Sequence, residues 1–188
     1  FGAAKGGAID AALSALVDQA PVGTLQFLRA WAALPCYRTV ALEWRLLREE
    51  RALWAGAPYT PGFVTVDAVV QCGAQVLLIR RGRPPGQGLL ALPGGFLEPR
   101  ETVLQSALRE LDEETGLRLW PHDMQHALRT VRVFDPPDRS QRGRVITHAH
   151  HFDLGPRRLP DLRAGDDASA CQWVPIDTLG ALEDQFHD

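Results

Sequence analysis

The sequence predicts an α+β sandwich. Three observations predict it: alternating, β-branched runs recur after residue 62, one strongly amphipathic helix interrupts them, and a short helical pattern closes the chain. The 188 residues are 45% hydrophobic, which is enough for one domain of ordinary size with some chain left over. We therefore expect a single α+β domain preceded by a helical N-terminal extension.

The first third of the chain differs in character from the rest. Over residues 10–55 apolar side chains recur mostly every three to four positions and strand signals are almost absent, so we expect helices, interrupted at Pro35. The segment AGAPYTPG, residues 55–62, is rich in proline and glycine and indicates a boundary. We expect residues 1–57 to be a helical extension or the remnant of an upstream domain. The first residue is Phe1, which agrees with a piece cut from something longer.

Residues 58–188 carry the strand signals. The predicted strands are FVTVDAVV (63–70), GAQVLLIRR (73–81), HALRTVRVFD (126–135), RVITHAHHFDL (144–154) and CQWVPI (171–176). The short turn between the first two predicts a hairpin. The last segment, DTLGALEDQF (177–186), has a helical pattern.

Composition excludes several classes of protein. Twenty basic residues stand against 23 acidic ones, a net charge of -3, which argues against a nonspecific nucleic-acid binder. Charged residues, glycine or proline interrupt every apolar run within about ten positions, so we expect no contact with a membrane. The three cysteines are far apart and form no metal-binding spacing, which favours a reduced, cytoplasmic setting.

One helix has clear start and stop signals. Thr102 and Gln105 form a T-x-x-Q capping box, and Gly116 supplies a left-handed stop, so we expect a helix over residues 103–115. Its core-facing side chains, at spacings of three and four, are Leu104, Ala107, Leu108 and Leu111.

The opposite face of this helix carries an acidic cluster. Glu110, Glu113 and Glu114 lie at i, i+3 and i+4, near the C-terminal end, where the helix dipole disfavours negative charge. A solvated acidic face is one interpretation. A bound divalent cation, Mg²⁺ or Mn²⁺, is the other, because only Arg109 lies nearby to balance the carboxylates. The preceding Gly94-Gly95 turn allows the backbone to come close to a metal or phosphate.

Residues 95–117 resemble the signature of the Nudix hydrolases, G-x5-E-x7-R-E-U-x-E-E-x-G-U with U apolar. Every defined position matches: Gly95, Glu101, Arg109, Glu110, Leu111, Glu113, Glu114, Gly116 and Leu117. The resemblance implies an α/β/α sandwich with a mixed sheet and Mg²⁺- or Mn²⁺-dependent hydrolysis of a nucleoside diphosphate linked to another group. It also implies that the three glutamates and the carbonyl of Gly95 bind the metal, and that Arg109 orients Glu101 and the metal carboxylates.

A narrower resemblance points to a substrate. The stretches LLALPGGFLEPRET (89–102), DRSQRGRVITHAHHF (138–152) and AGDDASACQWVPI (164–176) are similar to the Nudix domain of bifunctional nicotinamide mononucleotide adenylyltransferase/ADP-ribose pyrophosphatases. This similarity implies hydrolysis of ADP-ribose to AMP and ribose 5-phosphate, and pairing into a homodimer. The alternatives are NADH or another nucleotide sugar as substrate, or a regulator that senses ADP-ribose without cleaving it. The H-x-G-H motif of the adenylyltransferase is absent.

The general base and the substrate contacts are less sharply predicted. Glu113 or Glu114 is a candidate base, and loop carboxylates Asp166 and Asp167 are the alternative. Candidate substrate-binding residues are Asp67, Arg81, Arg142 and Arg144, together with Asp166 and Asp167. A metal site at His148 and His150 is disfavoured relative to packing, and stacking of a base on Trp120 or Trp173 is a minority option.

Overall fold

The structure is a computed structural model that describes residues 30, 32–140, 142–165 and 167–187. The chain divides into two units between Gly56 and Ala57. In the first unit, helix α3 (Pro35–Leu53) begins with a proline in its first turn, where the fixed φ of proline suits a helix and its missing N–H is not needed. The predicted interruption at Pro35 is therefore the start of a helix. The helices expected before residue 30 lie outside the described residues.

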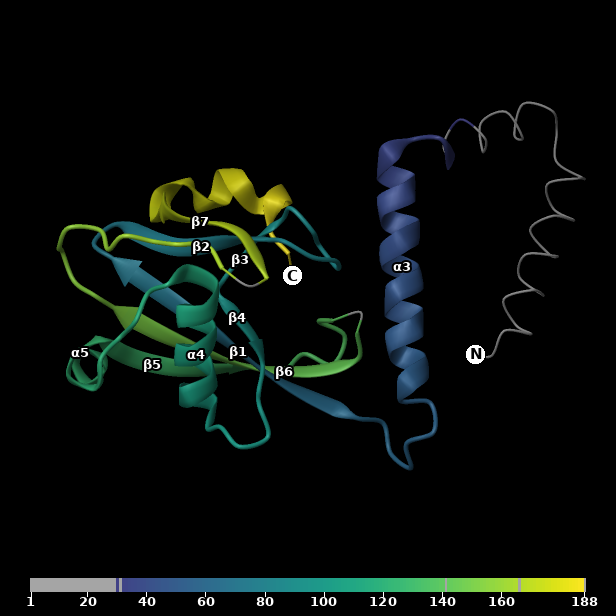
Figure 1. The fold of residues 1–188 in the computed structure, drawn as a ribbon, viewed down its shortest axis with the longest axis horizontal. Helices are drawn as coiled ribbons and strands as arrows, with labels where there is room; N and C mark the ends of the chain where they lie inside the picture. The colour runs from purple at the N-terminus through teal and green to yellow at the C-terminus, as the bar shows by residue number, and fades with distance from the viewer. Residues whose placement is uncertain (1–29, 31, 141, 166, 188) are drawn as a thin grey trace, which may run out of the picture. The chain divides into compact units, whose positions relative to one another are not determined.

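The described part of the second unit contains one mixed sheet (Figure 1). Its strands are β1 (Gly62–Cys72), β2 (Gln75–Arg81), β3 (Leu90–Ala91), β4 (Gly94–Phe96), β5 (Leu128–Phe134), β6 (Arg144–Asp153) and β7 (Ala168–Pro175). The main path is β3-β2-β1-β6-β5, with β4 paired to β1 and β7 paired to β2. The pair β1–β6 is parallel and the other pairs are antiparallel, including the predicted hairpin of β1 and β2.

Three helices accompany the sheet: α4 (Val103–Thr115), α5 (Pro121–Ala127) and the 3-10 helix η1 (Ile176–Gln185). The sequence did not predict α5, and it assigned residues 126 and 127 to a strand. That assignment was wrong, because an acidic residue in the first turn of α5 and a histidine in the last turn both suit the helix dipole. The closing helix is of the 3-10 type, with Gly180 in its interior weakening any α-helix there.

Buried apolar residues lie on both faces of the sheet. Leu77 and Leu78 are adjacent in β2 and point to opposite faces, and each belongs to a different core cluster. The cluster of Leu77 includes Leu111 of α4 and Phe152 of β6, whereas Leu179 of η1 packs on the cluster of Leu78. Figure 1 shows α4 and η1 on opposite sides of β2 and β7. The α+β sandwich is confirmed.

Within the described ranges, no helix combines the length and the apolar character that crossing a membrane requires.

Candidate functional site

Helix α4 is fixed at both ends by its own sequence. The backbone N–H of Thr102 donates to Gln105 Oε1 at 2.8 Å, and the N–H of Gln105 donates to the Thr102 hydroxyl at 3.3 Å. Gly116 ends the helix with φ 68°, a left-handed conformation that a glycine adopts without strain. The predicted helix over residues 103–115 is confirmed. Its apolar face packs on the sheet, and the acidic cluster extends from buried Glu114 to the more exposed Glu113.

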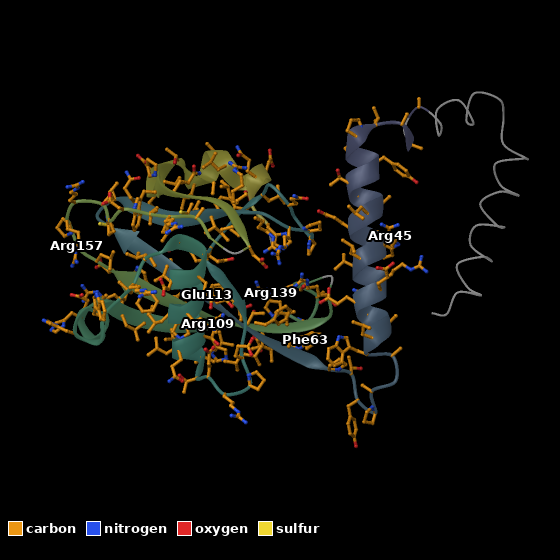
Figure 2. All side chains as sticks on the ribbon, viewed as in Figure 1. Arg45, Phe63, Arg109, Glu113, Arg139 and Arg157 are labelled. Carbon is orange, nitrogen blue, oxygen red and sulfur yellow. The ribbon has the colours of Figure 1, made fainter. Side chains whose placement is uncertain are left out.

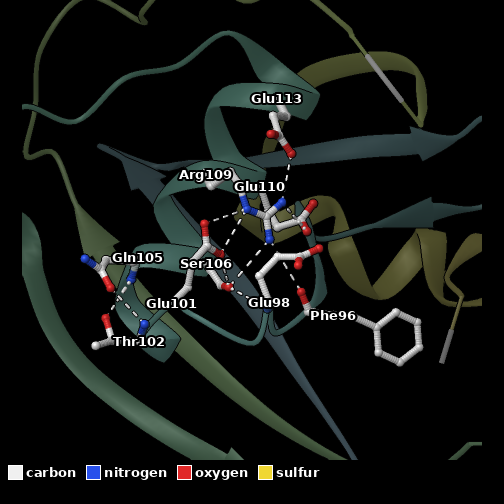
Figure 3. Close-up of polar contacts among 9 residues, drawn as sticks. All are labelled: Phe96, Glu98, Glu101, Thr102, Gln105, Ser106, Arg109, Glu110 and Glu113. Atoms are coloured by element: carbon white, nitrogen blue, oxygen red, sulfur yellow. Dashed lines mark hydrogen bonds and ion pairs between the residues drawn. The ribbon is translucent and has the colours of Figure 1, made fainter.

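Arg109 lies at the centre of that acidic side (Figure 3). Its Nε donates to Glu101 at 3.0 Å, and its Nη1 donates to Glu110 Oε1 at 2.9 Å and to Glu113 Oε2 at 2.8 Å. Burial alone would lower the pKa of Arg109, but the hydrogen bonds to the three carboxylates outweigh it and raise that pKa. One guanidinium therefore holds three glutamates together.

Glu101 is oriented by a second residue that sequence reasoning missed. The hydroxyl of Ser106, which is fully buried, donates to Glu101 Oε2, and this bond is the main cause of the lowered pKa of Glu101. The hydroxyl of Ser106 also accepts from the backbone N–H of Glu98 at 3.3 Å. The available signal was the spacing, because Ser106 precedes Arg109 by three residues and shares its side of the helix.

Glu114 differs from the other carboxylates. It is only 5% exposed, and its Oε2 accepts from the backbone N–H of Gly94 at 2.9 Å. Burial raises its pKa to about 8, and the neighbouring Glu110 adds to this rise, whereas Arg81 acts against it. A carboxylate held in so little water is favourable only beside a positive charge.

The bend before Gly94 leads into strand β4, and neither Gly94 nor Gly95 has room for a side chain. Strand β4 pairs with β1, and a Cβ added to Gly95 would lie 2.5 Å from Glu110 Oε1. A Cβ added to Gly94 would lie 2.6 Å from Asp67 Oδ1. The backbone therefore lies close to these carboxylates, and this close approach depends on both glycines.

The donor atoms of this cluster suit a hard divalent cation, since carboxylate and carbonyl oxygens are what Mg²⁺ and Mn²⁺ prefer. Within the part of the chain that the structure describes, however, no three His, Cys, Asp or Glu side chains converge on a metal-binding position. Arg109 takes that central place, bonded to Glu110 and Glu113. Cation binding would require these two carboxylates to exchange Arg109 for the metal.

Three of the predicted substrate-binding residues lie near Glu114 or Gly94. Arg81 lies within electrostatic reach of Glu114, and its Nε donates to the carbonyl of Pro85 at 2.8 Å. Asp67 lies against the Gly94 turn. The negative charge of Asp167 adds to the rise in the pKa of Glu114. The Asp167 carboxylate forms a 2.8 Å ion pair with the exposed Arg83. Asp166 lies outside the described residues.

The loop between β5 and β6 brings Arg142 toward the Gly94-Gly95 turn, whereas Arg144 bonds within the loop itself. The Cζ of Arg142 lies 5.4 Å from the centroid of the Phe96 ring. Arg144 donates to the carbonyl of Asp135 and lies 3.8 Å from its carboxylate. Arg139, in the same loop, donates to the hydroxyl of Thr147 on β6.

Of the two histidines considered as a metal site, His150 is packed in the core and His148 is half-buried. His150 is 1% exposed and stacks on Phe152, with ring centroids 6.3 Å apart. Burial lowers the pKa of His150, which keeps it neutral in the core. Its neighbour His151 makes a 3.2 Å hydrogen bond to Gln71 Oε1.

A model of the NUDIX domain family matches residues 62–188, which include β1, the glycine turn and all of α4. The chain belongs to the Nudix family. A relative from Methanocaldococcus jannaschii, an "ADP-ribose pyrophosphatase", is 37% identical over 120 residues, covering 63% of this chain and 65% of that protein. The "Phosphatase NudJ" of Escherichia coli is 30% identical over 116 residues, covering 62% of this chain and 70% of that protein.

A similar solved structure is the bifunctional NMN adenylyltransferase/ADP ribose pyrophosphatase of Francisella tularensis, complexed with AMP and a manganese ion. It has a TM-score of 0.81 and 39% sequence identity, and the match covers 87% of this chain and 48% of that protein. This chain thus spans about half the length of the bifunctional protein and 65% of the archaeal relative.

Proposed function

We propose that this Nudix chain hydrolyses ADP-ribose to AMP and ribose 5-phosphate with Mg²⁺ or Mn²⁺ as the cofactor. The observation that carries the proposal is the contact of Gly94 and Gly95 with buried Glu114 and with Glu110, while Arg109 joins Glu110 to Glu113. The names of the archaeal and Francisella relatives support ADP-ribose, and the manganese ion of the latter supports a divalent cation.

Glu110, Glu113, Glu114 and the carbonyl of Gly95 would hold the cation, which neutralises charge on the phosphate oxygens and activates water. Glu101 and Ser106 hold Arg109, and Arg109 keeps Glu110 and Glu113 close together until a cation takes its place. Arg81, which lies within electrostatic reach of Glu114, would bind a phosphate. Glu113 is the most exposed of the three glutamates, at 43% against 15% for Glu110, so it is the one that can take a proton from the attacking water.

The reaction forms a bond from the water oxygen to one phosphorus and breaks the bridging phosphoanhydride bond, and the released proton passes to the carboxylate. The test is to incubate the chain with ADP-ribose, NADH and a panel of nucleotide sugars, with Mg²⁺, Mn²⁺ or chelator. We expect release of AMP and ribose 5-phosphate from ADP-ribose only when a divalent cation is present.

Glu114→Gln should lose this activity by a factor of 100 or so, the order of magnitude expected when a group that stabilises the transition state is removed. Its matched control is Glu183→Gln, which changes an exposed glutamate of η1. The proposal fails if ADP-ribose is not cleaved, if chelator leaves the rate unchanged, or if both variants have the wild-type rate. Binding of ADP-ribose without cleavage would favour the sensing alternative.

For the remainder of the chain, we propose that residues 1–57 are a helical extension or the remnant of an upstream domain and that residues 58–188 are the catalytic domain. The Francisella match supports this, because it covers 87% of this chain and so extends beyond the family match at residues 62–188. Expression of residues 58–188 alone should retain the wild-type rate. The homodimer stays a prediction, and light scattering of the full chain would test it.

A further inference from the structure

Three side chains form an aromatic and cationic cluster beside the glycine turn. Phe96, the residue after Gly95, packs edge-to-face against Phe63, with ring centroids 5.9 Å apart and planes at 74°. The guanidinium of Arg142 lies over the Phe96 ring at 5.4 Å. We call these three residues the Phe96 cluster. They come from β4, from β1 and from the loop that precedes β6, so the fold, rather than the local sequence, assembles them.

The ring of Phe96 is held in place but not covered. Phe63 and Arg142 fix its position, yet the residue remains 39% exposed. The loop that carries Arg142 is itself anchored by Arg144 to Asp135 and by Arg139 to Thr147. Figure 2 shows Phe63 and Arg139 at the same end of the domain. A flat, partly open aromatic face is therefore presented at a defined position.

This position adjoins the carboxylate cluster. The carbonyl of Phe96 accepts from Arg109 Nη2 at 3.5 Å, and the same guanidinium bonds Glu110 and Glu113. Gly95, one residue away, lies against Glu110. In a nucleotide, one ribose separates the phosphate from the base. A substrate whose phosphates lie at the carboxylates can therefore place its base near Phe96.

Aromatic rings and guanidinium planes are the groups on which proteins stack nucleobases. We propose that the base of the nucleoside diphosphate substrate stacks on the face of the Phe96 ring that Arg142 does not cover, and that Arg142 holds the ring from its other face rather than binding a phosphate. The inference rests on the proposed function for the position of the phosphates. Stacking tolerates different bases, because each has a π-face, so AMP and GMP should bind similarly.

The test measures binding of AMP, GMP and ribose 5-phosphate to the full chain by calorimetry, with Mn²⁺ present. Loss of one stacked base corresponds to a weakening of about 5-fold to 100-fold. We expect Phe96→Ala to weaken AMP and GMP binding by that factor and to leave ribose 5-phosphate binding unchanged. Phe96→Trp should bind AMP as tightly as the wild type does, because tryptophan keeps an aromatic face. Arg142→Gln should weaken AMP binding more than ribose 5-phosphate binding.

Tyr59→Ala is the matched control, since Tyr59 is an 85% exposed aromatic outside the Phe96 cluster. Stacking on Phe96 is overturned if Phe96→Ala binds AMP as the wild type does, if it loses both ligands equally, or if the wild type does not bind AMP. Equal losses of both ligands in Arg142→Gln would make Arg142 a phosphate ligand. If the wild type binds AMP through Phe96 but does not cleave ADP-ribose, the proposed function fails and the stacking stands. If the wild type cleaves ADP-ribose and Phe96→Ala binds AMP as the wild type does, the stacking proposal fails and the proposed function stands.

Discussion

Glu114→Gln should stabilise the metal-free protein, and increasingly so as the pH rises. In the unfolded chain this carboxyl ionises near its ordinary pKa of 4.5, whereas burial raises the folded value to about 8. Its contribution to the free energy of unfolding is therefore retained below about pH 4.5 and lost progressively up to pH 8. Glutamine is uncharged at every pH, and its carbonyl oxygen can still accept from the Gly94 N–H.

The size of the effect follows from the two pKa values. One pKa unit corresponds to about 1.4 kcal/mol, so the variant should gain roughly 4 kcal/mol relative to the wild type between pH 5 and pH 9. For a chain of this length, that gain corresponds to a difference in Tm on the order of 10 °C.

Thermal unfolding in chelator, followed by circular dichroism at pH 5, 7 and 9, measures this difference. Glu183→Gln should show no pH-dependent difference from the wild type. Added Mn²⁺ should stabilise the wild type at pH 9 but not Glu114→Gln, because the cation compensates the buried charge. If the difference between Glu114→Gln and the wild type stays constant from pH 5 to pH 9, burial does not control this carboxyl and the reasoning is wrong.

Three further predictions concern α4 and the turn before it. Gly95→Ala should reduce ADP-ribose hydrolysis at least about 10-fold, because its Cβ would lie 2.5 Å from Glu110 Oε1, whereas Gly180→Ala, whose Cβ meets no atom within 4 Å, should keep the wild-type rate. Thr102→Ala should lower the free energy of unfolding in urea by about 1 kcal/mol through loss of the helix cap, and an unchanged midpoint would contradict that role. Arg109→Lys should lower both the Tm in chelator and the rate of hydrolysis, because an ammonium group cannot bridge Glu101, Glu110 and Glu113 with the fork of a guanidinium; retention of both would refute it.

The limits of α4 could be predicted because they depend on short-range signals. Thr102, Gln105 and Gly116 act within one turn of the residues that they cap, so the sequence alone is sufficient. The core face of the helix follows from spacing in the same way. The burial of Glu114 could not be predicted, since it results from the approach of β4, which is held in place by its pairing with β1.

The Phe96 cluster and the anchoring of Arg144 were also beyond prediction. Both depend on which loop the sheet places beside which strand, and the composition of residues 135–144 indicates only exposure. Of the predicted carboxylate cluster, Glu110 and Glu113 are paired with Arg109 in the structure. Helix periodicity places Glu113 at i+4 from Arg109, so an ion pair between them can be expected. It does not show that the Arg109 side chain also reaches back to Glu101.

The guanidinium of Arg109 also bears on whether the chain folds before or after it binds a cation. Four acidic side chains within residues 110–114 would repel one another at the unfavourable end of a helix, and Arg109 is an internal counter-ion for two of them. We therefore expect the chain to fold before any cation arrives, unlike zinc fingers, whose folding waits for their metal. A divalent cation must then compete with the guanidinium of Arg109 for Glu110 and Glu113. The fraction of protein with a bound cation should therefore follow the concentration of free divalent ions.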